Sequence, residues 1–92
     1  MNDPTPHKTP GITTFAPCGP HALPLFSINP DIHVMDALAH SANLQRVSNQ
    51  LMIDSAMGDC GPHLAWAAVY LNEMAQAIVE DLASARVVSE LE

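Results

Sequence analysis

Apolar residues recur at helical spacing along two long segments of this chain, Val34–Met57 and Pro62–Val88, and the short turn Gly58-Asp59-Cys60-Gly61 separates them. An α-helix rotates by about 100° per residue, and this rotation gives the first segment one mixed face of small, polar and apolar side chains: Ala37, His40, Ser41, Leu44, Val47, Ser48, Leu51 and Ser55. The second segment has a cleaner apolar stripe: Leu64, Ala67, Ala68, Leu71, Met74, Ala75, Ile78, Leu82 and Ala85. The pattern predicts two helices, at about 33–57 and 62–88, which pack antiparallel because their connection is short.

The ends of both predicted helices carry capping signals. The first helix should begin between Asp31 and Val34, where Asn29 or Asp31 can cap the exposed amides. Gly58 stands where a left-handed closing residue is favoured, and Pro62 suits the first turn of the next helix.

Serine recurs every seven residues in the first helix, at Ser41, Ser48 and Ser55. Small side chains at this interval allow a neighbouring helix to approach closely. We expect their hydroxyls to bond to carbonyls one turn back in the same helix.

Two helices that contact along one line leave apolar surface uncovered. Trp66 and Tyr70 lie off the centre of the second stripe, and burial of one aromatic side chain of about 150–250 Å² contributes several kcal/mol. We therefore predict an all-α helical hairpin that dimerises into a four-helix bundle. Its predicted interface residues are Leu44, Val47, Leu51, Trp66, Tyr70, Leu71, Met74 and Ile78. In the alternative, residues 23–28 fold back and cover Trp66 within one chain.

Residues 1–24 contain six of the eight prolines, a composition typical of an extended or disordered arm. We place the domain boundary after this arm, so that residues 25–92 form the helical domain. A brief alternation over Leu23–Ile28 predicts a short strand that ends at the Asn29-Pro30-Asp31 turn. No second strand pattern is visible, so this strand should pair with its symmetry mate or lie across the helices.

Charge and hydropathy narrow the classes of partner. Ten acidic against three basic residues give a formal charge of −7, so no basic strip is available for nucleic acid or an anionic membrane. No apolar run reaches the roughly 18 residues of a membrane span, and the N-terminus does not resemble a secretion signal. We expect a cytoplasmic protein with free thiols.

The tetrapeptide Cys-Gly-Pro-His occurs twice and supplies a possible metal-ligand set: Cys18, His21, Cys60 and His63. Tetrahedral zinc accepts two thiolates and two imidazoles. Against this, the first copy lies in the predicted arm and the second coincides with an ordinary turn and helix start. The dipole of the second helix would favour the thiolate of Cys60, although Asp59 opposes it. We predict no metal site and no cofactor.

Catalytic patterns are weak in this sequence. His33 and His40 are seven residues apart, but neither helix carries the Glu-x-x-His pair of a di-iron bundle. Glu73 and the run Glu80-Asp81 suggest a solvated acidic face. No nucleophile has a strand-to-helix context and no glycine-rich phosphate loop is present. We predict that the protein is not an enzyme.

The second predicted helix, over His63–Asp81, resembles the C-terminal signature of a family of small bacterial proteins catalogued only as a domain of unknown function. The stretch Phe26–Leu38 is similar to that family's entry into its first helix, although Pro30-Asp31 replaces an expected Pro-Gly turn. The resemblance covers about residues 25–85 and leaves the arm outside. It implies a helical hairpin, and it brings no known activity or binding residues.

The leading functional hypothesis is a small, acidic, non-enzymatic protein-association module that forms a homodimer and acts as an adaptor or regulator of an unidentified protein partner. The alternative is a metal- or redox-responsive sensor of a small ligand. It would use the Cys-Gly-Pro-His segments, with Cys60, His63 and Trp66 near the turn.

Overall fold

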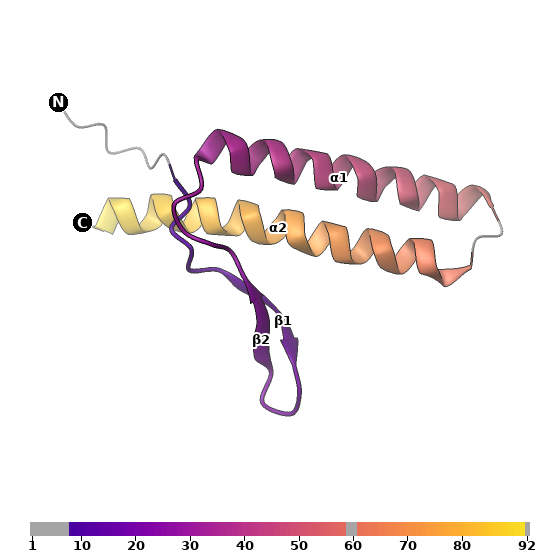
Figure 1. Ribbon diagram of the computed structural model, residues 1–92, viewed down its shortest axis with the longest axis horizontal. Helices are drawn as coiled ribbons and strands as arrows, with labels where there is room; N and C mark the ends of the chain where they lie inside the picture. Colours follow the sequence, from indigo (N-terminus) through magenta and orange to yellow (C-terminus); the bar gives the residue numbers. More distant parts are fainter. Residues whose placement is uncertain (1–7, 59–60, 92) are drawn as a thin grey trace.

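The computed structural model describes residues 8–58 and 61–91, with side chains described as far as residue 84. Along the chain follow strands β1 (Thr14–Cys18) and β2 (Leu23–Ser27) and helices α1 (Val34–Met57) and α2 (Pro62–Leu91), as Figure 1 shows. The two predicted helices are present at the predicted limits, and α2 runs three residues beyond 88. They lie side by side and antiparallel.

The helix ends differ from the expected caps. His33, rather than Asn29 or Asp31, is the N-cap of α1, and its Nδ1 accepts a hydrogen bond from the amide of Met35 at 3.2 Å. Gly58 is extended, with φ −139°, so the expected left-handed closing residue is wrong there. Gly61 takes the left-handed conformation instead, at φ +69°, immediately before Pro62 begins α2.

The expected all-α class is wrong, because the chain is α+β. The strand predicted near residues 23–28 is present as β2, but it pairs antiparallel with β1 of the same chain, in the register Thr14↔Ser27 to Cys18↔Leu23. β1 lies in the segment expected to be an extended arm. The expected four-helix bundle is unsupported. The described part of the chain contains the two helices and this sheet, and the structure is of a single chain.

The pairing of the two strands continues toward the helices through residues 8–13, which we call the strap. The buried Thr9 holds it: its amide donates to the Ile32 carbonyl at 2.7 Å, and its carbonyl accepts from the Asp31 amide at 2.9 Å. The Thr9 hydroxyl donates to the Asn29 carbonyl at 2.7 Å and accepts from the Ile32 amide at 3.0 Å. The strap is therefore fixed to the segment that leads into α1.

Asp81 of α2 anchors the other side of the strap. Its Oδ2 accepts from the Gly11 amide at 3.0 Å, and its Oδ1 accepts from the amides of Ile12 and Thr13 at 2.9 and 2.8 Å. Three successive N–H groups around one carboxylate form an anion-binding concavity, here filled from within the chain. The expected solvated acidic face is therefore wrong at Asp81, which has no exposed surface.

The seam between α1 and α2 is built from serine and alanine. Ser41 and Ser48 are buried, which fits the close approach predicted from their spacing. Their hydroxyls do not bond within α1 as expected. Ser41 Oγ donates across the seam to the Ala75 carbonyl at 3.0 Å, and Ser48 Oγ donates to the Ala68 carbonyl at 2.8 Å. These bonds tie the helices together at points two turns apart.

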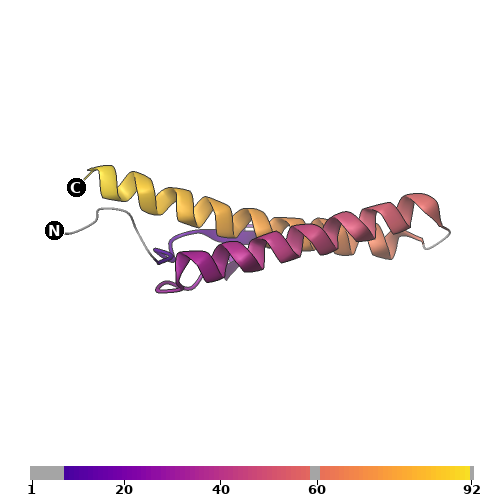
Figure 2. The same ribbon diagram turned by 90° about the horizontal axis from the view of Figure 1, so that it is seen from above.

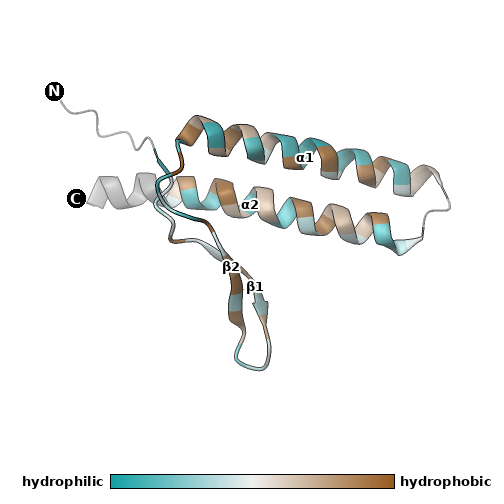
Figure 3. Cartoon of the chain, in the orientation of Figure 1, coloured by the Kyte–Doolittle hydropathy of each residue, from teal (hydrophilic) through white to brown (hydrophobic). Residues whose placement is uncertain are grey.

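The core of the described chain contains no large apolar side chain. The buried hydrophobic residues are all alanines: Ala37, Ala68, Ala75 and Ala77. The molecule measures 17 Å along its shortest axis, little more than one helix of about 10–12 Å diameter. Figure 2 shows this single layer edge on, and Figure 3 shows hydrophobic residues along both helices and in β2.

Candidate association surface

The two strands project beyond the edge of α2, roughly in the plane of the helix pair (Figures 1 and 2). β1 meets α2 near Ala77, where Phe15, Ala16 and Pro17 line a shallow hollow together with residues of the helix. Toward the interhelix loop, both broad faces of the pair are left open. The 100° spacing of helical side chains separates these faces into two different surfaces.

The first of these surfaces carries six of the eight residues that the sequence predicts for an interface, and helical spacing turns the other two, Trp66 and Tyr70, toward the outer edge of α2 and away from the seam. We call these eight residues together the aromatic face. Leu44, Leu51, Leu71 and Ile78 border the seam and are half-buried. Trp66 and Tyr70 are 58% and 57% exposed, and Val47 and Met74 are 37% and 38% exposed. The segment around β2 does not cover Trp66, so the alternative in which it folds back over the indole is not what the structure adopts.

The two aromatic side chains of this face lie one helical turn apart and contact each other. The ring centroids of Trp66 and Tyr70 are 6.1 Å apart with an interplanar angle of 30°. Stacking restricts both rings before any partner arrives, which reduces the side-chain entropy lost on binding.

One end of the aromatic face is closed by the loop that precedes α1. Ile78 lines a hollow of about 440 Å³ together with Thr9, Ser27, Ile28, Asn29, Ile32, Asp36, Ala37 and His40. The open part of the face therefore begins beyond Ile78 and extends toward the interhelix loop.

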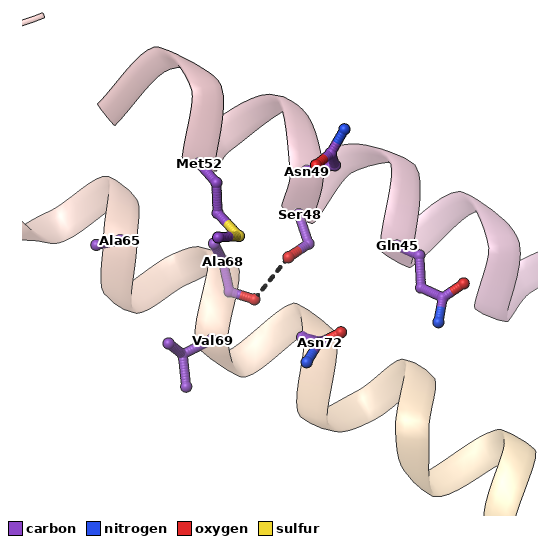
Figure 4. Close-up of a pocket in the computed structure, with 8 residues that line it drawn as sticks. All are labelled: Gln45, Ser48, Asn49, Met52, Ala65, Ala68, Val69 and Asn72. Atoms are coloured by element: carbon purple, nitrogen blue, oxygen red, sulfur yellow. Dashed lines mark hydrogen bonds between the residues drawn. The ribbon is translucent and has the colours of Figure 1, made fainter. Parts of the chain in front are cut away.

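The opposite broad face carries a groove between the helices, which we call the carboxamide groove (Figure 4). It has a volume of about 560 Å³ and is lined by Gln45, Ser48, Asn49, Met52, Ala65, Ala68, Val69 and Asn72. The floor of the groove offers no free hydroxyl donor, because the Ser48 hydroxyl already donates to the Ala68 carbonyl. The floor is therefore effectively apolar. Met52 and Val69 are 58% and 44% exposed. All eight of these lining residues are uncharged.

The electrostatics of the strap anchor favour the ionised form of Asp81. Burial raises the pKa of this carboxyl, but hydrogen bonds donated by the amides of Gly11, Thr13 and Ile12 and by the Thr13 side chain outweigh the burial. The pKa of Asp81 therefore lies below its ordinary value of 3.8. The carboxylate is charged near neutral pH and accepts three backbone amides, which makes it a structural anchor.

The candidate metal ligands do not form a described cluster. Cys18 is an exposed free cysteine at the end of β1, His21 is exposed in the loop that follows, and His63 is exposed at the start of α2. Cys60 lies outside the described residues. Within residues 8–58 and 61–91, no group of three or more His, Cys, Asp and Glu side chains could hold a metal ion. The β1–β2 loop and the start of α2 also lie in separate parts of the molecule (Figure 1).

Sequence reasoning missed the anchor of the strap and the carboxamide groove. One signal for the anchor was available: Asp81 lies four residues after Ala77 and seven after Met74, on the apolar side of α2, whereas Glu73 and Glu80 share the outer side. A signal for the groove was the pair Gln45 and Asn49, which are four residues apart on α1. Neither of the described helices has the length and apolar character needed to cross a membrane.

Comparison with known proteins gives one match. The model of the family described as "Protein of unknown function (DUF3077)" matches residues 9–85. The match begins at Thr9, so it includes the strap except for its first residue, and the sheet that the resemblance seen in the sequence left outside. No curated protein and no solved structure matches the chain.

Proposed function

We propose that this chain, which belongs to the DUF3077 family of proteins of unknown function, is a non-enzymatic association module that self-associates through its aromatic face. The observation that carries the proposal is the exposure of Trp66 and Tyr70, at 58% and 57%, while the buried hydrophobic residues among the described side chains are all alanines. In this role the module acts as an adaptor or regulator in the cytoplasm. Its second copy supplies the layer that the helix pair lacks.

The architecture of the single chain motivates a partner. Domains normally bury apolar surface between two packed layers, whereas this chain is 17 Å thick. Small domains rarely gain more than about 3–5 kcal/mol from one core unless a metal, a disulfide or oligomerisation adds to it. Alanine side chains bury little area, so the described core lies at the weak end of this range.

The aromatic face is large enough to matter energetically. Aromatic side chains offer about 150–250 Å² each, so the exposed parts of Trp66 and Tyr70 amount to roughly 200–250 Å² per chain, an upper-bound gain of about 5–6 kcal/mol on full burial. In a symmetric dimer this gain is made twice, while association costs an estimated 4–15 kcal/mol. Val47 and Met74 enlarge the same surface.

Charge also favours this face over the rest of the surface. The chain carries a formal charge of −7, so two copies repel each other on average. The eight residues of the aromatic face are uncharged, although helical spacing aligns Asp54 with Val47 and Glu73 with Trp66, each two turns away. Two copies that meet through this face keep most of their acidic side chains in solvent.

The test introduces one carboxylate either within the aromatic face or outside it. Met74→Glu puts a carboxylate within the face, and the matched control Gln76→Glu adds it two residues away on an exposed position of the same helix. Sedimentation equilibrium across a concentration series measures the monomer–dimer constant of each. We expect Gln76→Glu to dimerise like the wild type and Met74→Glu to weaken dimerisation by about 10- to 100-fold, since an unpaired carboxylate would have to be buried.

Circular dichroism of both variants checks that the helices remain. A wild-type protein that is monomeric at the highest concentration contradicts self-association. A Met74→Glu variant that dimerises as well as Gln76→Glu would place the contact elsewhere and remove the aromatic face from the proposal.

A further inference from the structure

The β1–β2 hairpin is an apolar and uncharged projection on an acidic protein. Residues 9–30 contain no Asp, Glu, Lys or Arg, so the formal charge of −7 belongs entirely to the rest of the chain. Leu23 and Leu25 are 65% and 63% exposed, and they lie on one face of β2 because they are two residues apart. Phe26 on the other face is 49% exposed. Such a surface is typical of a contact element.

The hairpin cannot use this surface on its own helices. The Asp81 carboxylate and the hydrogen bonds of Thr9 fix its base at the end of the helix pair away from the interhelix loop. From there the strands point away from the helices (Figure 1). A two-stranded hairpin is only marginally stable alone, so a surface on another molecule would stabilise it.

The hairpin could contact another molecule through its free edges or through its faces. The Ile28 amide donates to the Thr13 carbonyl, so the alternation of an antiparallel pair directs the missing N–H groups of Pro17 and Pro24 between the strands and leaves the outer edges unaffected. Leu23 and Leu25 share one face of β2, which we call the leucine face. Packing through this face buries apolar surface that an added strand would leave exposed.

The carboxamide groove offers the complementary surface. Its floor of Ser48, Ala65 and Ala68 is formed by small residues, and Met52 and Val69 present apolar walls beside it. Methionine adapts its shape to an irregular partner. The three carboxamide side chains at the rim each carry a donor and an acceptor, and the free edges of a two-stranded sheet carry unpaired backbone N–H and C=O groups.

We propose that the β1–β2 hairpin of one copy lies in the carboxamide groove of a second copy. The leucine face of the hairpin covers the apolar floor, and the rim carboxamides bond to its free edge. Both surfaces are uncharged, so two acidic chains approach here without bringing carboxylates together. This contact is separate from the aromatic face and goes beyond the proposed function.

The contact joins two different surfaces, so it has a consequence for assembly. A contact between unlike surfaces closes only if its symmetry allows and otherwise continues head to tail. A copy that uses both the aromatic face and the hairpin links one dimer to the next. We expect the wild type to form species larger than a dimer as its concentration rises.

The native thiol of Cys18 at the end of β1 gives a direct test. In a Cys60→Ser background, Asn49→Cys places a second thiol in the groove, and the control Asn43→Cys places one on the outer side of α1. Mild oxidation with diamide, followed by non-reducing electrophoresis and peptide mapping, measures the disulfide between Cys18 of one copy and the introduced thiol of another. We expect this disulfide to form about tenfold faster in the Asn49→Cys variant than in the Asn43→Cys variant, in proportion to local thiol concentration.

A charge-exchange experiment tests the same contact without cysteine. Leu25→Asp should abolish the species larger than a dimer, as should Val69→Lys. An equimolar mixture of the two variants should regain them for two reasons. The unaltered hairpin of Val69→Lys can lie in the unaltered groove of Leu25→Asp, and the introduced carboxylate of one variant meets the introduced ammonium group of the other. Rescue by mixing excludes misfolding as the cause of the loss.

The outcomes separate this contact from the aromatic face. Loss of species above the dimer in Leu25→Asp with the dimer intact supports the proposal, whatever Met74→Glu does. Equal oxidation rates in the Asn49→Cys and Asn43→Cys variants, or failure of the mixture to restore larger species, overturn it. A wild type that never exceeds a dimer, and whose dimer persists in Leu25→Asp, also overturns it, and would leave the groove to a polypeptide of another kind.

Discussion

The buried carboxylate of Asp81 allows a quantitative test of how the strap is held. Asp81→Asn keeps the size of the side chain but replaces one accepting oxygen with an NH₂ group that donates. The carboxylate accepts three amides, two at Oδ1 and one at Oδ2, so one nitrogen must now face at least the Gly11 amide. At least one hydrogen bond is lost and one buried donor is left without a partner.

The expected cost follows from these losses. A hydrogen bond to a charged group contributes about 1.5–3 kcal/mol, and a buried donor without a partner costs about 1–3 kcal/mol in desolvation, which overlaps with the lost bond. We therefore expect Asp81→Asn to lower the free energy of unfolding by about 2–4 kcal/mol. That is a large share of the stability of a domain of this size.

Urea denaturation followed by circular dichroism measures the loss, and amide hydrogen exchange at Gly11, Ile12 and Thr13 locates it. Glu80→Gln is the matched control, because Glu80 is the adjacent exposed acid and its side chain accepts only from Gln76. An Asp81→Asn protein within about 0.5 kcal/mol of the control, with unchanged exchange in the strap, would refute the anchoring role.

The same anchor predicts how stability depends on pH. The pKa of Asp81 is lower in the folded chain than its ordinary value of 3.8, so the unfolded chain binds the proton more tightly. The stabilisation is fully present above about pH 4 and is lost as the pH falls through the folded pKa. The difference in stability between the wild type and Asp81→Asn should therefore shrink steadily below about pH 4. A difference that stays constant from near-neutral to strongly acidic solution contradicts the charge-assisted bonds.

Two further predictions concern the backbone at Gly11 and the seam between α1 and α2. Gly11→Ala should loosen the strap, because a Cβ there would lie 2.5 Å from the Pro30 nitrogen. The control Gly19→Ala has a similar positive φ with nothing within 4 Å, so it should cost only the strain of about 1–2 kcal/mol, and equal melting temperatures of the two variants would contradict the predicted clash. Ser48→Ala should cost about 1 kcal/mol by removing the bond across the seam, whereas Ser84→Ala, whose hydroxyl bonds within α2, should be nearly neutral. Equal urea midpoints for these two serine variants would show that the bond across the seam adds nothing.

The parts of the fold that the sequence predicts are those set by neighbouring residues. The periodic stripes, Pro62 and the short turn define both helices, and the alternation after residue 23 defines β2. The sequence of β1 shows no such alternation. The strand is also irregular, because Ala16 has a positive φ of 58° and Pro17 lacks an amide donor. The strap before it is fixed by Asp81, which lies 68–70 residues away in sequence. A proline-rich composition predicts an extended or disordered arm, whereas residues 14–18 of that segment pair as β1 and residues 11–13 are held by contacts that local propensity does not contain.

The exposure of the large apolar side chains and the small size of the core have one physical origin, which is the seam of serine and alanine between α1 and α2. Small residues at Ser41, Ser48, Ala68 and Ala75 bring the helices close enough for hydroxyls of one to reach carbonyls of the other. Close approach leaves no room between the helices for large side chains, so the leucines, methionines and aromatics are displaced to the flanks. The apolar residues that would form a core in a thicker protein therefore line two open faces of a thin one. Widening the seam by Ser48→Leu should reverse this relation: it should bury more of the flanking residues within one chain, and weaken every contact between copies that depends on their exposure.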